Sequence, residues 1–274
     1  MVEALKQFRS GGLLSYIVGE AGAPSSVVVD PTVGSMEEYR VHFAETRSKP
    51  SGILITSRSE EFGSGLAQLR REQGLSEADP FDPGQVAPGS PRLGRLPGGM
   101  PGEQAYSWER CLFSGDQIRL GSSQGVPARF SGLPNSTWVL PSMERDGLLF
   151  STLGMERGRS GQKALEDSDR TPSIAISKFQ AKVEQAQAGT LFVDIREPSE
   201  FLSGHIPGSV NFPMSELPLH WEKLRDAQRI YVCCLSGRRS QPTVQTLSYL
   251  GLADVVQVSG GFQSWLQSGY PVQK

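Results

Sequence analysis

Two adjacent thiols, Cys233 and Cys234, stand at the end of an apolar run and directly before a short polar loop. The run is Arg229–Cys234 (RIYVCC), the loop is LSGRR, and Ser240–Pro242 can begin a helix because proline is tolerated in a first turn. A sulfur at such a strand end is surrounded by backbone N–H donors, and two arginines add positive charge. These groups favour the thiolate. The spacing therefore indicates a nucleophilic sulfur that can hold an extra sulfur as an anionic persulfide.

Only one of the two thiols can face that loop. Successive side chains of a strand point to opposite faces, so Cys234 is expected at the loop and Cys233 in the core. Gly237 would permit the tight curl that the loop needs. The alternative is that both are inert buried cysteines, since cysteine is often buried. The pattern of this loop alone leaves both interpretations open.

The amino-acid composition argues against several classes of function. The chain has 274 residues, only three cysteines and three histidines, and a net charge of −2. Few histidines disfavour a histidine-rich metal centre, and an odd, small number of cysteines fits a reducing compartment. The balanced charge gives no support to a nucleic-acid partner. No apolar run of membrane-spanning length and no apolar signal core occur, so we expect a cytoplasmic protein that contacts no membrane.

The secondary-structure elements expected around these residues predict two domains. Strand–helix alternation near the C-terminus predicts a parallel α/β sheet with strands 190–195, 229–234 and 255–259 and helices 178–189 and 243–251. Short β-rich runs dominate the first part: strands are expected at 15–19, 25–32, 52–57, 116–121 and 146–151, and a helix at 64–74. A Pro/Gly-rich flexible surface loop is expected at Pro80–Gly102, and an interdomain linker at Arg157–Ser173.

The C-terminal part resembles the rhodanese domain of sulfurtransferases. Besides the cysteine loop, the resemblance rests on three motifs in family order: VDIREPSEF (Val193–Phe201), GHIPGS (Gly204–Ser209) and SGGFQSW (Ser259–Trp265). It implies a three-layer domain, residues 173–274, in which helices cover a parallel sheet. It also implies that the cysteine attacks the outer sulfur of a donor such as thiosulfate and passes it on as a persulfide.

The resemblance also implies site residues. Cys234 matches the family's catalytic cysteine, the first residue of C-x-x-G-x-R, and Arg239 matches its arginine. The loop that would cradle the substrate comprises Leu235, Ser236, Gly237, Arg238, Arg239 and Ser240. Asp194 and Arg196 match a pair that supports the loop. Structural roles are expected for His205, Phe262 and Trp265.

The first 165 residues resemble a metallo-β-lactamase domain, the partner found fused to rhodanese domains in persulfide dioxygenase-like proteins. The resemblance implies an αββα sandwich whose T-H-x-H-x-D-H ligand run is lost. Leu133 and Leu153 are taken as the positions of the next histidine and of the aspartate of F-x-G-D. The lost run reads Thr56, Ser57, Arg58, Ser59, Glu60, Glu61, Phe62. One carboxylate, Glu61, cannot hold a two-metal site, so a degenerate, metal-free domain is expected.

These patterns favour a sulfurtransferase that uses Cys234, needs no cofactor, and moves sulfane sulfur from a small anionic donor to a thiol or cyanide. The alternative is a non-catalytic scaffold in which the N-terminal domain docks a protein partner and the rhodanese domain is vestigial. An intact Cys–Gly–Arg loop separates the two. The sequence names neither the physiological donor and acceptor nor the oligomeric state.

Overall fold

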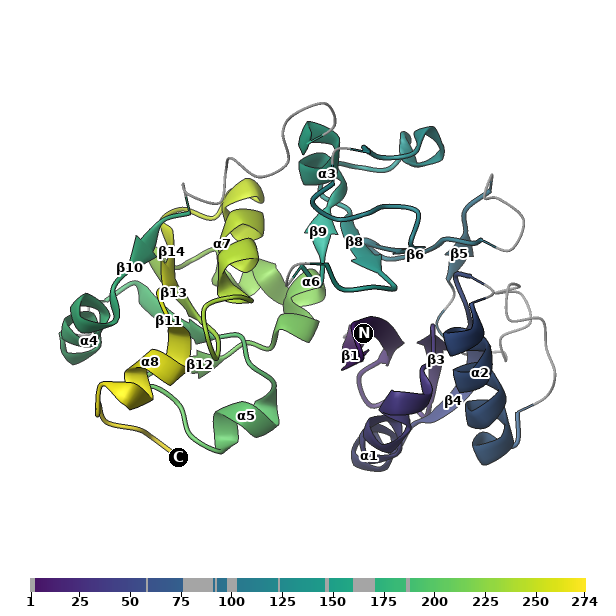
Figure 1. The fold of residues 1–274 in the computed structure, drawn as a ribbon, viewed down its shortest axis with the longest axis horizontal. Coiled ribbons are helices and arrows are strands. Elements are labelled where there is room, and N and C mark those ends of the chain that lie inside the picture. The colour runs from purple at the N-terminus through teal and green to yellow at the C-terminus, as the bar shows by residue number, and fades with distance from the viewer. Residues whose placement is uncertain are drawn as a thin grey trace. The chain divides into compact units, whose positions relative to one another are not determined.

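The computed structural model describes residues 3–57, 59–75, 91, 93–97, 103–122, 124–145, 148–159, 171–185 and 188–274. The chain forms two compact units, Met1–Gln162 and Lys163–Lys274, which are drawn in Figure 1. This division falls within the predicted linker, although Arg157 belongs to the last helix of the first unit. Among the described residues, no helix is long and apolar enough to cross a membrane.

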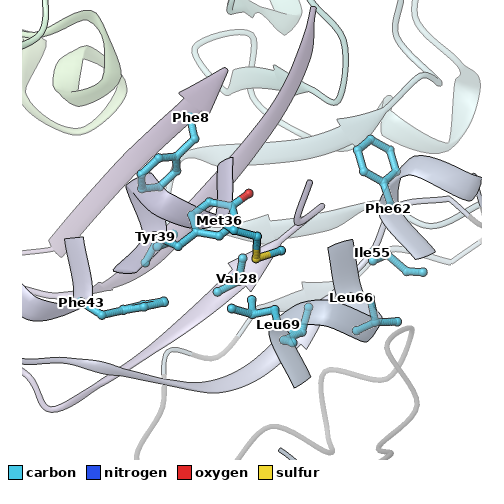
Figure 2. Packing of buried hydrophobic residues seen from close by; sticks show 11 residues of the cluster. Phe8, Val28, Met36, Tyr39, Phe43, Ile55, Phe62, Leu66 and Leu69 are labelled. Atoms are coloured by element: carbon cyan, nitrogen blue, oxygen red, sulfur yellow. The ribbon is translucent and has the colours of Figure 1, made fainter. Parts of the chain in front are cut away.

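The first unit begins with a four-stranded sheet in the order β1-β2-β3-β4. Its strands are β1 (Glu3–Ser10), β2 (Leu13–Glu20), β3 (Ser25–Val29) and β4 (Lys49–Leu54). Helices α1 (Met36–Thr46) and α2 (Glu60–Gln73) cover one face of this sheet. Figure 2 shows Met36 of α1 close to Val28 of β3 and Tyr39, with Leu69 of α2 nearby. Burial of this apolar cluster fixes both helices to the sheet.

A second sheet follows in the order β5-β6-β7-β8-β9. Its strands are β5 (Gly94–Arg95), β6 (Tyr106–Trp108), β7 (Cys111–Gly115), β8 (Trp138–Pro141) and β9 (Ser151–Thr152). Helix α3 (Leu153–Arg159) follows β9 directly. An outer apolar cluster joins α3 to this sheet through Leu153, Leu112 and Val139.

The two sheets face each other. The rings of Tyr16 in β2 and Phe113 in β7 lie 5.2 Å apart, and the Tyr16 hydroxyl donates to the Pro141 carbonyl at 2.5 Å. Their sequence neighbours Ile17 and Leu112 point the other way, into the helical layers. The layer order is therefore helix, sheet, sheet, helix, and the predicted αββα sandwich is confirmed.

Three sequence-based expectations in this unit are wrong or only partly right. Residues 116–121 form turns rather than a strand, and Ile118 and Leu120 are buried because they pack under the outer layer. Of the strand expected at 146–151, residues 146 and 147 lie outside the described residues, and among the rest only Ser151 belongs to a strand, β9. The expected surface loop Pro80–Gly102 lies mostly outside the described residues, but within it Leu93 is buried and β5 pairs with β6.

The second unit is a parallel sheet in the order β10-β14-β13-β11-β12. Its strands are β10 (Ser173–Ile174), β11 (Thr190–Asp194), β12 (Val210–Asn211), β13 (Arg229–Cys233) and β14 (Val255–Val258). Its helices are α4 (Ile176–Glu184), α5 (Pro198–Leu202), α6 (Leu217–His220), α7 (Ser240–Tyr249) and α8 (Gly261–Gln267).

Helices cover both faces of this sheet (Figure 1). On one face, Phe179 of α4 and Trp265 of α8 pack with Tyr231 and Cys233 of β13. Side chains alternate along β13, so Ile230 and Val232 point to the opposite face, where α7 packs against β13 and β14. The predicted three-layer parallel domain is confirmed, and β13 lies at its centre.

Candidate active site

The Cys234 thiol lies where the central strand ends and the loop begins. Cys234 follows β13 directly and is 1% exposed. The Gly237 backbone N–H donates to its Sγ atom at 3.2 Å, and Ser240 Oγ lies 3.7 Å from the same sulfur. Gly237 has φ +89°, a conformation that L-residues rarely adopt. The loop therefore curls around the sulfur as the sequence predicted.

The carbonyl groups of the loop are held away from the sulfur by α8. The N–H groups of Phe262 and Gln263, in the first turn of α8, donate to the carbonyls of Cys234 and Leu235, each at 2.8 Å. Gly261 makes this approach possible, since a Cβ atom there would lie 2.2 Å from the Cys234 carbonyl oxygen. With its carbonyls bound on the outside, the loop can present N–H groups inward.

Cys233 occupies the opposite face of the strand. It packs with Phe262 and Trp265, and its thiol lies 3.3 Å from the Cys234 carbonyl, to which it donates. Burial raises the pKa of the Cys233 thiol well above its ordinary value. The third cysteine, Cys111, is fully buried in β7 of the other unit. Neither sulfur lies in the loop that surrounds Cys234.

The two loop arginines differ in their surroundings. Arg239 directs Nη1 and Nη2 at the carboxylate of Glu200 in α5, at 3.2 and 3.1 Å, whereas Arg238 is exposed. Burial of Glu200 favours its neutral form, but the Arg239 guanidinium, with smaller contributions from the Glu197 N–H and Arg196, outweighs burial and lowers the pKa of Glu200. The sequence suggested a direct substrate contact by Arg239. In the structure its terminal nitrogens instead tie the loop to α5.

The predicted supporting residues form a buried ion pair beside β13. Arg196 Nη2 lies 2.7 Å from Asp194 Oδ2 and also donates to the Gly204 carbonyl at 2.8 Å. The guanidinium lies over the Phe262 ring, 4.2 Å from its centroid. His205 contacts the Phe201 carbonyl through Nδ1 at 3.0 Å. These contacts hold α5 and α8 in place around the sheet edge, which is a structural role.

The N-terminal positions compared with metal ligands have structural surroundings. Ser59 is the N-cap of α2 and accepts from the Phe62 N–H at 3.4 Å, while Glu61 is exposed. Phe62, Leu133 and Leu153 belong to or pack against apolar clusters. Within the described part of the chain, no three His, Cys, Asp or Glu residues are grouped as metal ligands would be.

Two of these assignments, Leu133 and Leu153, were wrong, because F-x-G-D follows the histidine turn in the family order and here it precedes both leucines. The chain retains F-x-G-D as Phe113–Asp116, with Asp116 directly after β7, whereas Leu153 begins α3 in the outer layer. The strand-ending aspartate is therefore present and exposed.

Sequence reasoning missed three residues that shape the site. Glu200 stands within the REPSEF motif and was not singled out. Gly261, the first residue of α8, is the second of two adjacent glycines, a signal that could have indicated a close backbone approach. Gln257 of β14 donates through Nε2 to the Gly237 carbonyl at 2.8 Å. A single glutamine in a strand carries no pattern that would have revealed this contact.

Fold and site together define a class of α/β domains that present one cysteine at the carboxyl end of a central parallel strand. Residues 177–268 match the family model described as the Rhodanese-like domain. Through these residues the chain belongs to the rhodanese-like family. It is 35% identical over 93 residues to the uncharacterized protein YqhL of Bacillus subtilis, a match covering 34% of this chain and 71% of YqhL.

A further relative is named "Putative sulfur carrier protein YrkF" from Bacillus subtilis, 31% identical over 107 residues. That match covers 39% of this chain and 57% of the length of YrkF. Among solved structures, a rhodanese-related protein from Thermoplasma volcanium is 39% identical, with 37% of this chain and 97% of that chain covered and a TM-score of 0.34. A metallo-beta-lactamase from Staphylococcus aureus is 17% identical, with 94% and 99% covered and a TM-score of 0.44.

Proposed function

We propose that this protein is a sulfurtransferase that carries sulfane sulfur on Cys234. The observation that carries the proposal is the Gly237 N–H, which donates to Cys234 Sγ at 3.2 Å from a loop whose Cys234 and Leu235 carbonyls are bound by α8. Such donors stabilise a thiolate and the terminal anion of a persulfide. Membership of the rhodanese-like family supports sulfur transfer, and the name of its relative, "Putative sulfur carrier protein YrkF", points in the same direction.

The proposed reaction has two steps. The Cys234 thiolate attacks the outer sulfur of thiosulfate, the S–S bond of thiosulfate breaks, and its electron pair leaves on sulfite. The new Cys–S–S⁻ group then gives its outer sulfur to cyanide, forming thiocyanate, or to a thiol, forming a persulfide of that thiol, and the Cys234 thiolate returns. Neither step needs a histidine base, because the thiolate is itself the nucleophile.

Charge supports an anionic donor. Arg238 is the exposed cation of the loop, while the Arg239 charge is matched by Glu200. We therefore assign Arg238 to the donor and Arg239 to positioning the loop. A small anionic donor and a thiol acceptor are the partners of this proposal. The three cysteines form no disulfide bond in the structure, which fits the reducing, cytoplasmic setting that the proposal also includes.

The test uses three single variants of the full chain. Cys234→Ser is expected to abolish thiocyanate formation and the mass gain of one sulfur atom after incubation with thiosulfate. Cys233→Ser and Cys111→Ser are the matched controls and should retain most activity. Activity that survives in Cys234→Ser and disappears in Cys233→Ser would show that the neighbouring thiol is the nucleophile. A wild-type protein inactive with every donor tried would favour the scaffold function.

A further inference from the structure

The Gly237 carbonyl is held by donors from two elements. Gln257 Nε2 donates from β14 at 2.8 Å, and Ser240 Oγ donates from the start of α7 at 3.1 Å. The Gln241 N–H, also in α7, adds a longer contact at 3.3 Å. Of these, only Gln257 comes from outside the loop and the helix that continues it. The contact joins the loop to a neighbouring strand of the sheet.

Holding this carbonyl also fixes the direction of an N–H group. In a trans peptide the C=O and the N–H point to opposite sides, so a Gly237 carbonyl directed at β14 turns the Arg238 N–H away from β14. A residue with positive φ, as at Gly237, aligns successive N–H groups into an anion-binding concavity. The preceding N–H of this series, that of Gly237, already points at Cys234 Sγ.

The residue type at position 257 is not explained by packing. Strands inside a parallel sheet are usually apolar throughout because both faces are covered. The neighbours Val255, Val256 and Val258 follow that rule, and Gln257 breaks it on an inner strand paired on both sides. A partly buried amide stabilises the fold only through its hydrogen bonds, and the Gln257 amide donates through Nε2 to the Gly237 carbonyl.

We propose that Gln257 is a positioning residue for sulfur transfer: it orients the Gly237–Arg238 peptide so that the loop N–H groups face the sulfur carried by Cys234. This inference rests on the proposed function and adds a residue to its site. In this role Gln257 acts on the loop peptide and not directly on the thiol or the donor. Loss of its hydrogen bond leaves the nucleophile in place and allows the peptide to rotate, which removes donors from the anionic sulfur.

The decisive variant is Gln257→Met, which keeps the length and nearly the volume of the side chain and removes the donor. Gln257→Glu replaces the donor with an acceptor that repels the Gly237 carbonyl. The matched control is Gln245→Met in α7, where Nε2 donates to Thr171 Oγ1 at 2.9 Å, away from the loop. For each variant we would measure kcat and KM for thiosulfate and the melting temperature. We would also measure how the rate of Cys234 alkylation by iodoacetamide depends on pH.

For Gln257→Met we expect kcat/KM for thiosulfate to fall about 3- to 10-fold, as loss of one net hydrogen bond implies. Gln257→Glu should fall at least as far, and Gln245→Met should stay within about twofold of wild type. Unchanged kinetics in Gln257→Met would overturn the inference. So would equal losses in Gln257→Met and Gln245→Met that follow the melting temperature, because that result indicates a purely structural amide.

Failure of the proposed function is distinguishable from failure of this inference. If the wild-type protein forms no persulfide with any donor, the alkylation of Cys234 still reports on the loop. Slower alkylation near pH 7 in Gln257→Met, with Gln245→Met matching wild type, would support the positioning role without sulfur transfer. Identical alkylation profiles in all three proteins would refute it.

Discussion

Replacing Gly261 with alanine tests whether the close approach of α8 to the cysteine loop builds the sulfur site. Gly261 has φ +60°, and an added Cβ would lie 2.2 Å from the Cys234 carbonyl oxygen and 2.7 Å from that of Leu235. Both obstacles are backbone atoms, so no side chain can move aside. The helix must retreat, and the Phe262 and Gln263 N–H groups then lose their acceptors.

The magnitude follows from two contributions. Placing a Cβ in the left-handed region costs roughly 1 kcal/mol, and two lost backbone hydrogen bonds cost about 1 kcal/mol each. Gly261→Ala should therefore lower the free energy of unfolding by about 3 kcal/mol. Gly269→Ala is the matched control in the same unit: it has φ +71°, and nothing lies within 4 Å of its added Cβ. It should lose only about 1 kcal/mol.

Urea unfolding of both full-length variants, followed by tryptophan fluorescence, measures the difference. Sulfur loading from thiosulfate, read by mass, should fall in Gly261→Ala under conditions where the protein is folded and remain normal in Gly269→Ala. Equal destabilisation of the two variants would refute the reasoning, since the contact with the loop would then contribute nothing beyond backbone strain. Normal loading in folded Gly261→Ala would show that α8 does not shape the site.

Three further predictions concern charge and metal. Burial, opposed by two Thr56 hydrogen bonds, raises the pKa of Asp30 from 3.8 to about 7. Between about pH 4 and pH 7 only the unfolded state loses this proton, so the free energy of unfolding of the wild type should fall by up to about 4 kcal/mol as the pH rises. In Asp30→Asn the free energy of unfolding should lack this decrease, and urea unfolding at each pH measures the difference. Glu200→Gln should lower kcat/KM for thiosulfate a few-fold by loosening Arg239; an unchanged value would mean that the ion pair does not hold the loop. Elemental analysis should find no stoichiometric metal, and one or two iron or zinc ions per chain would contradict the degenerate-site interpretation.

The C-terminal site was largely predictable because its determinants are local. The thiol, the glycine and the arginines lie within six residues, and strand alternation alone separates Cys234 from Cys233. The sequence did not reveal which group each of these side chains contacts. Arg239 was assigned to the donor, but Glu200 lies 39 residues earlier in α5 and takes up its guanidinium. Such a pairing depends on tertiary structure that no local spacing encodes.

The N-terminal errors have a different cause. Residues 116–121 alternate like a strand, but Ile118 and Leu120 are buried by an outer layer that also covers turns. Leu153, which follows the strand expected at 146–151, was matched to a strand-ending aspartate, whereas the chain carries F-x-G-D at the end of β7. An alternating apolar pattern indicates which residues are buried, but it does not show whether they lie in a paired strand or in a turn beneath a covering layer.

The surroundings of Cys234 come from separate stretches of the chain: the loop after β13, the strand β14 and the first turn of α8. No single fragment of the chain contains all of them. During synthesis, the carbonyls of Cys234 and Leu235 cannot be bound by α8 until Gln263 has emerged from the ribosome, 29 residues after the thiol. At about 5–20 residues per second, this delay is on the order of seconds. The unfinished chain thus exposes Cys234 as an ordinary cysteine, and the hydrogen bonds that shape the loop around its sulfur form only on completion of the domain. The alkylation rate of Cys234, which is 1% exposed in the folded domain, should therefore change as the domain folds, and pulse-labelling of nascent chains can measure that change.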